Sequence, residues 1–270
     1  FGKNKFMHKI IAIYRYYADK RFSTIAGTLV YFLLMSIAPF VLWLTLAFGN
    51  VDVERIFSHA LFESVAPFLR YLKQSAQSAA SGAGIILLAT SLYSSTNFFY
   101  HLRRSGEIIY ETDRVKGGLK LRLASLLLIA ATILLVAATA GITVTGTKLL
   151  SYLFPQFISE MITSVFFTAL AFLIALVMNI FACPYKLKLS YAVPGSLLTT
   201  ALWLVFVVGF GAYMSFADPE RLYGKIASVI VFLLWCYVMM SCFVIGMINN
   251  RKALEKQGYP LKMKPLKKVM

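Results

Sequence analysis

The sequence predicts an all-α, polytopic membrane protein with six transmembrane helices, additional interfacial amphipathic helices, and both termini in the cytoplasm. Hydrophobic residues make up 59% of the chain and charged residues only 14%, whereas a soluble domain carries about a quarter charged residues. Long apolar runs recur along the chain. Lysine and arginine are abundant in every second segment between these runs and sparse in the others.

The apolar runs define the expected transmembrane helices. Each is long enough to cross a hydrocarbon core about 30 Å thick. Backbone groups in lipid must hydrogen-bond within their own segment, which favours helices, and β-barrel strands would be shorter and alternate in polarity. The runs cover about 25–49, 83–101, 121–147, 162–182, 193–216 and 226–248.

The distribution of basic residues predicts the orientation. Segments on one side of the expected membrane hold 21 Lys and Arg residues, and segments on the other side hold 6. Basic residues accumulate on the cytoplasmic side of membrane proteins, so both termini are expected there. The net charge of +16 is then expected to face anionic lipid headgroups, and no nucleic-acid partner is expected.

Three segments flank or interrupt the six-helix domain, which is expected to cover 23–250. Residues 1–22 show helical spacing of apolar side chains, which is typical of an amphipathic helix in the cytoplasmic interface, and they are too polar for a cleavable signal peptide. Residues 50–82 form an external segment with helical periodicity. Residues 251–270 form a basic cytoplasmic tail.

Pro39 interrupts the first span. Proline lacks an N–H and clashes with the carbonyl one turn earlier, so it is expected to kink the helix and free the carbonyl of Met35. Ser36 is close enough in sequence to help solvate that carbonyl.

Residues that could carry chemistry are scarce. None of the eleven acidic residues lies inside an expected span, which argues against a carboxylate-based proton relay. The three histidines are far apart, and there is no metal-ligating cluster, nucleophile motif or nucleotide-binding loop. We therefore expect no enzyme activity, no metal and no cofactor.

The second span carries the most polar residues. Thr90, Ser94, Asn97 and His101 share one face of a helix, and Tyr93 lies on an adjoining face. This row is a candidate substrate path. It is equally compatible with helix packing, because Ser and Thr bond back to the helix and Asn joins neighbouring helices.

Four basic residues should lie near the cytoplasmic end of that face. Arg103 and Arg104 end the second span, and Lys186 and Lys188 lie in the loop between spans four and five. Together they are expected to form a cationic rim to a hydroxyl-lined groove.

The ordered sequence resembles the YihY/BrkB family of bacterial inner-membrane proteins. The resemblance is carried by YADKRFSTIAGTLVYFLLMSIAPF (17–40), CPYKLKLSYAVPGSLLTTALW (183–203), the Tyr213 region and YGKIASVIVFLLWCYVMMSCFVIGMINN (223–250). It implies a six-span protein of the bacterial inner membrane and a transport role, with suggested links to export of envelope lipids. An acidic residue that the family suggests near position 248 is absent. The family was once labelled a ribonuclease.

These observations predict a transporter, flippase or exporter of an amphipathic, anionic, lipid-like substrate, which would use the polar groove of the second span. The expected partners are membrane lipids with anionic headgroups, and a homo-oligomer is compatible with the sequence. An alternative is a scaffold for envelope assembly that works through 50–82 and the basic tail. A ribonuclease has the weakest support, because the cytoplasmic carboxylates form no apparent cluster.

Overall fold

The computed structural model places part of the chain. It describes the backbone of residues 11, 15–48, 93–94, 96–112, 118, 121–131, 134–135, 155–184, 189–217 and 226–256, and their side chains except at 37–48 and 156. The external segment 50–82, most of the interfacial segment 1–22 and the tail beyond 256 lie outside the described residues.

Every regular element in the described ranges is a helix, which confirms the all-α class there. Three helices are long and apolar enough to span a membrane, and they coincide with the last three expected spans. The six-span count and the orientation stay predictions. The labelled helices are α2 (Phe22–Phe48), α6 (Asn97–Ile109), α8 (Gln156–Ala182), α9 (Leu189–Phe216) and α11 (Ala227–Lys256). A further helical segment covers Leu121–Ala131.

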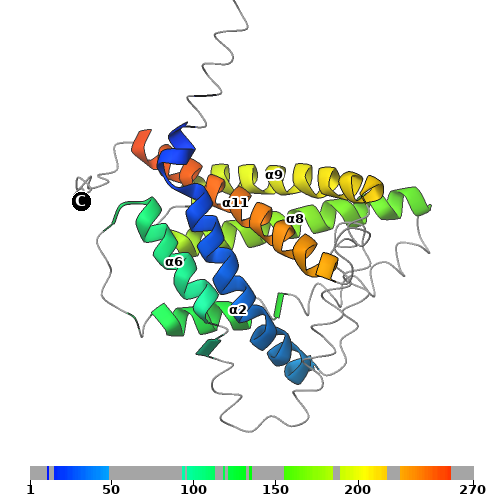
Figure 1. The fold of residues 1–270 in the computed structure, drawn as a ribbon, viewed down its shortest axis with the longest axis horizontal. Helices are drawn as coiled ribbons and strands as arrows, with labels where there is room; N and C mark the ends of the chain where they lie inside the picture. Colours follow the sequence, from blue (N-terminus) through cyan, green and yellow to red (C-terminus); the bar gives the residue numbers. More distant parts are fainter. Residues whose placement is uncertain are drawn as a thin grey trace, which may run out of the picture.

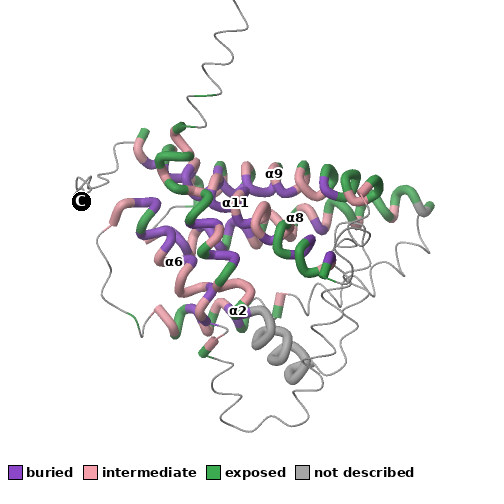
Figure 2. Tube along the Cα trace, in the orientation of Figure 1, coloured by how far each residue is buried: buried purple, intermediate pink, exposed green. Residues whose placement is uncertain are grey.

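Helix α11 lies at the centre of the helical bundle. It packs against α9 and α2, while α8 packs against α9, and α6 contacts both α2 and α8 (Figure 1). Phe243, Val244 and Met247 of α11 are fully buried. The outer helices α8 and α9 instead carry long exposed stretches (Figure 2). Val205 of α9, for example, is 72% exposed, and apolar side chains with that exposure are suited to lipid.

Helices α9 and α11 approach closely where two glycines face each other. A Cβ at Gly195 would overlap the carbonyl oxygen of Gly246, and a Cβ at Gly246 would overlap the Thr199 side chain. The close approach allows the Gly195 N–H to donate to Asn250 Oδ1 at 2.7 Å. Small residues at such positions let helix backbones come together in membranes.

The last helix extends beyond the expected end of the sixth span. The sequence predicts an end near 248, but α11 continues to Lys256 and takes in the first residues of the expected basic tail. The reason is Arg251, whose side chain is fully buried and bonded to the ends of other elements. Residues 251–256 therefore form part of the folded bundle.

Candidate functional site

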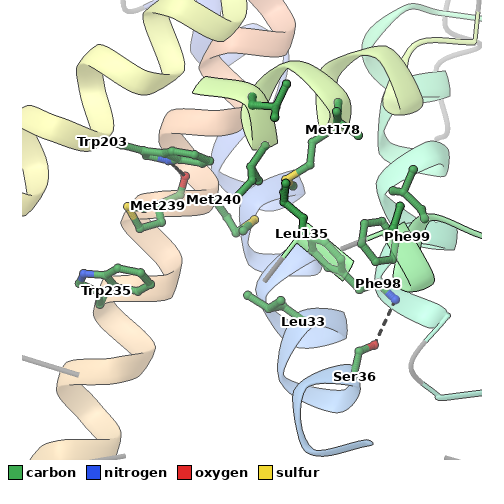
Figure 3. Close-up of a pocket in the computed structure, with 15 residues that line it drawn as sticks. Leu33, Ser36, Phe98, Phe99, Leu135, Met178, Trp203, Trp235, Met239 and Met240 are labelled. Carbon is green, nitrogen blue, oxygen red and sulfur yellow. Dashed lines mark hydrogen bonds between the residues drawn. The ribbon is translucent and has the colours of Figure 1, made fainter. Parts of the chain in front are cut away.

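An apolar cavity lies between the helices on one side of α11 (Figure 3). Its volume is about 440 Å³, within the range of about 300–1,000 Å³ that is usual for ligand pockets. Its walls come from α2, α6, α8, α9, α11 and three residues at positions 128, 131 and 135. The lining residues are Leu33, Ser36, Phe98, Phe99, Leu128, Ala131, Leu135, Leu173, Ile174, Val177, Met178, Trp203, Trp235, Met239 and Met240.

Two polar side chains in this wall, those of Trp203 and Ser36, form hydrogen bonds within the protein. The Trp203 indole N–H donates to the carbonyl of Met239 at 2.8 Å, and the Ser36 hydroxyl is bonded to the start of α6. Trp235 also has a partner within the structure. The remaining surface consists of aliphatic, aromatic and thioether groups, so the cavity suits a hydrocarbon chain.

Ser36 joins α2 to the beginning of α6. Its hydroxyl donates to the carbonyl of Ser94 at 2.9 Å and accepts from the backbone N–H of Phe98 at 3.1 Å (Figure 3). Thr96, at the N-cap of α6, provides no side-chain cap. Ser36 therefore satisfies one of the free N–H groups of the first helical turn. This contact differs from the expected role of Ser36 beside the Met35 carbonyl.

Helix α2 runs through Pro39 from Phe22 to Phe48. The Pro39 side chain is not among those that the structure describes, and the kink expected there stays a prediction.

The structure divides the polar row of the second expected span between two neighbours. His101 stacks on Phe32 of α2, with ring centroids 3.3 Å apart and an interplanar angle of 4°, and Ser94 contributes its carbonyl to Ser36. Asn97 and Tyr93 instead contact a side chain from the segment Leu121–Ala131. Thr90 lies outside the described residues.

That side chain is Arg122, which lies at the start of the third expected span and was not among the expected site residues. Its guanidinium donates to Tyr93 Oη at 2.8 Å, Thr96 Oγ1 at 3.2 Å and Asn97 Oδ1 at 3.4 Å. Its Cζ also lies 4.0 Å from the ring centroid of Tyr93, within the range of a cation–π contact. Arg122 thus occupies the polar face that was expected to line a groove.

Tyr100 lies between two arginines. The Cζ of Arg122 is 5.0 Å from the centre of its ring and that of Arg104 is 5.3 Å away. Arg104 also donates to Tyr100 Oη at 3.3 Å and pairs with the buried carboxylate of Glu107 at 2.6 Å. Glu107, Glu111 and Glu255 pair with other cations, and the hydrogen bonds of Arg122 to described side chains go to neutral acceptors.

Arg103 closes the end of α8. Its guanidinium donates to the carbonyl of Phe181 at 2.8 Å and to the carbonyl of Cys183. These are carbonyls that a helix end leaves without internal partners. Gly106, one turn later in α6, permits the contact because a Cβ there would overlap the Ala182 carbonyl. Lys186 and Lys188, the other two residues of the expected rim, lie outside the described residues.

A charged cluster joins the opposite end of α6 to α11. Arg251 Nη1 lies 2.8 Å from Glu111 Oε1 and donates to the carbonyl of Ile109 at 2.5 Å, while its Nε contacts Glu255 at 2.7 Å. Lys20 also pairs with Glu111, at 2.9 Å. The hydrogen bond from Arg251, aided by that from Lys20, holds the pKa of Glu111 below its ordinary value although burial opposes the shift. This cluster lies at the end of the 13-residue helix α6, which is about 20 Å long, whereas Arg122 contacts its beginning.

Among the described residues, no group of three or more His, Cys, Asp and Glu side chains is placed to hold a metal ion. Cys183, Cys236 and Cys242 are buried and form no disulfide among the described residues. The arrangement around Arg122 therefore offers binding chemistry: a cation, neutral hydrogen-bonding groups and an adjoining apolar cavity.

Comparison with known proteins identifies the family. The model of the family described as "Virulence factor BrkB" matches residues 13–268 of the chain. The chain belongs to the BrkB family. The resemblance seen in the sequence is thereby confirmed, and the match extends over nearly the whole chain.

Curated relatives of this BrkB-family chain carry two kinds of name. The chain is 24% identical over 257 residues to the "Putative ribonuclease-like protein YfkH" of Bacillus subtilis, and this alignment covers 86% of the chain and 92% of that relative. It is 36% identical over 64 residues to a "UPF0761 membrane protein" of Coxiella burnetii, which is 23% of either chain. A Xanthomonas campestris membrane protein is 27% identical over 84 residues, 20% of its length. No solved structure matches this chain.

The family assignment and the apolar helices make this a membrane protein. Ile248 stands where the resemblance suggests an acidic residue, and in this BrkB-family chain its side chain is fully buried in α11.

Proposed function

We propose that this BrkB-family protein moves an amphipathic, anionic, lipid-like substrate across the bacterial inner membrane. The observation that carries the proposal is the position of the apolar cavity directly beside the polar, cation-bearing start of α6. Phe98 and Phe99 line the cavity, and Asn97, the preceding residue, accepts a hydrogen bond from Arg122.

Each half of an amphipathic substrate has a matching surface in this arrangement. A hydrocarbon chain can move from the bilayer into the cavity at little cost in free energy, because lipid tails and apolar side chains are similarly nonpolar. A charged headgroup is expensive to place in hydrocarbon. The tyrosine, threonine and asparagine groups around Arg122 offer it a polar surface within the bundle.

The proposed orientation places both termini in the cytoplasm. Lys20 before α2, Glu111 after α6 and Arg251 near the end of α11 meet in one ion-pair cluster. The end of α8 is tied to α6 by Arg103. These helix ends therefore gather on one side of the bundle, in agreement with alternating passage of the chain through a membrane and with the excess of basic residues expected on the cytoplasmic side.

Lipid translocation in liposomes tests the proposal. Purified protein is reconstituted with headgroup-labelled anionic or zwitterionic lipids, beside protein-free vesicles. We expect protein-dependent movement of the anionic lipid. Ala131→Phe should abolish it by filling the cavity, whereas Ala130→Phe should not, because the two alanines are both exposed but only Ala131 lines the cavity. Absence of movement for every lipid, or equal loss in both variants, would contradict the proposal.

A further inference from the structure

Arg122 differs from three other basic residues of the bundle in having no carboxylate partner among the described residues. Lys20, Arg104 and Arg251 each pair with a carboxylate. Among the described residues, no carboxylate lies within ion-pair distance of Arg122. Its charge is instead held by neutral oxygens and aromatic rings, which orient a guanidinium without neutralising it.

The guanidinium is held with donors to spare. It has five N–H groups, and its contacts with Tyr93, Thr96 and Asn97 account for three hydrogen bonds. Tyr93 and Tyr100 fix its position through their rings. The side chain is half-buried. An anion can therefore reach it, and a planar guanidinium presents paired N–H groups that match the oxygens of phosphate.

The cavity is lined by residues of the same two helical segments that hold this cation. Leu128 and Ala131 line it from the same helical segment as Arg122, and Phe98 lines it from α6. Leu128 is about 9 Å along the helix axis from Arg122, which is the rise of six residues. A molecule with its charged group at Arg122 can thus place an attached chain among the apolar side chains of the cavity.

We propose that Arg122, together with Asn97 and Tyr93, binds the phosphate of an anionic phospholipid whose acyl chain occupies the cavity. This assignment rests on the proposed function and specifies its substrate class. Zwitterionic lipids fit less well, because their ammonium group would lie near the positive charge of Arg122, which nothing in the described residues neutralises. Free phosphate could use the same N–H donors but would leave the cavity unfilled.

Tryptophan fluorescence gives a direct binding assay, because Trp203 and Trp235 line the cavity. The third tryptophan, Trp43, is replaced in all samples by Trp43→Phe. Two single-chain lipids with brominated acyl chains serve as quenching probes in detergent: lysophosphatidylglycerol, which is anionic, and lysophosphatidylcholine, which is zwitterionic. Inorganic phosphate is tested as a competitor.

We expect lysophosphatidylglycerol to quench at lower concentration than lysophosphatidylcholine. Arg122→Gln should lower the affinity for the anionic probe about tenfold, which corresponds to about 1.4 kcal/mol, and leave the affinity for the zwitterionic probe unchanged. Arg122→Lys should lie between these, since it keeps the charge and loses the paired donors. Arg15→Gln makes the same substitution at an exposed site outside the cavity lining and should change neither probe.

Three results would overturn the assignment. They are no quenching by either probe in the parent protein, equal affinity for the anionic probe in Arg122→Gln and the parent, and competition by inorganic phosphate at concentrations as low as those of the lipid. If Arg122→Gln fails to fold, the ratio of the two affinities in Arg122→Lys decides, and an unchanged ratio refutes the role of the guanidinium. Binding as expected without translocation would refute the proposed transport and leave this site standing. Translocation by the parent protein, together with unchanged binding of the anionic probe in Arg122→Gln, would refute this site and leave the proposed transport standing.

Discussion

Replacing Asn250 by alanine is expected to destabilise the bundle by about 2–4 kcal/mol. Asn250 connects three helices through a buried network. Its Oδ1 accepts from the Gly195 N–H of α9 at 2.7 Å, and its Nδ2 donates to Asn179 Oδ1 of α8 at 3.0 Å. Asn179 in turn donates to Ser196 Oγ at 3.2 Å. All of these side chains are fully buried, so water cannot replace a lost partner.

The magnitude follows from the groups that Asn250→Ala leaves without partners. The Gly195 N–H and the Asn179 carbonyl oxygen would both be orphaned, at about 1–3 kcal/mol each. The two costs together would be about 2–6 kcal/mol. Side-chain hydrogen bonds in a membrane protein average only about 0.6 kcal/mol, so we expect a value in the lower half of this range, about 2–4 kcal/mol. The neighbouring Asn249 is half-buried. Asn249→Ala is therefore the matched control and should change the free energy of unfolding by less than about 1 kcal/mol.

Unfolding in mixed micelles can be followed with a thiol-reactive dye, because Cys183, Cys236 and Cys242 are buried in the folded state. The dye reacts as these thiols become accessible. Equal destabilisation by Asn250→Ala and Asn249→Ala would refute the assignment of the energy to the network.

Two further predictions use the same assay. Because Arg251 depresses the pKa of Glu111, the ionised form stabilises the fold. That stabilisation is fully present above the ordinary pKa of about 4.5 and is lost as pH falls through the lower pKa of the folded state. Glu111→Gln should therefore be less stable at pH 7 and lose part of the acid sensitivity; an unchanged pH profile would contradict this. Gly106→Ala should destabilise α6 against α8 because its Cβ would overlap the Ala182 carbonyl, whereas Gly209→Ala in α9 meets open space. Equal unfolding midpoints for these two glycine variants would show that the close approach is unimportant.

The helices were predictable because apolar composition and length act locally. Hydropathy alone locates α8, α9 and α11, as expected for segments that must satisfy their backbone in lipid. Helix ends depend on distant partners. Arg251 stabilises the extended end of α11 by bonding to Glu111, 140 residues away along the chain. The periodicity of α11 alone does not predict that contact.

The candidate site was predictable in part for the same reason. Asn97 and Tyr93 were expected at a site because their polarity stands out in an apolar run, and their contacts with Arg122 are what the structure adds. Arg122 was missed because an arginine at the start of a span is ordinarily a determinant of topology. Its contact with α6 depends on the path of the chain after α6, which brings Arg122 back to Asn97 over a separation of 25 residues. The sequence contained one local signal, a basic residue at the boundary of a long apolar segment.

The Arg251–Glu111 pair also constrains the order in which the protein can be completed during synthesis. Glu111 emerges from the ribosome before its partner, which is 140 residues later. At about 5–20 residues per second, the interval is roughly 7–28 s. Lys20 is already present and can hold the carboxylate meanwhile. The nascent α2–α6 pair thus has its own ion pair, and arrival of the last helix adds Arg251 and Glu255 to it, which completes the four-residue cluster of the finished bundle.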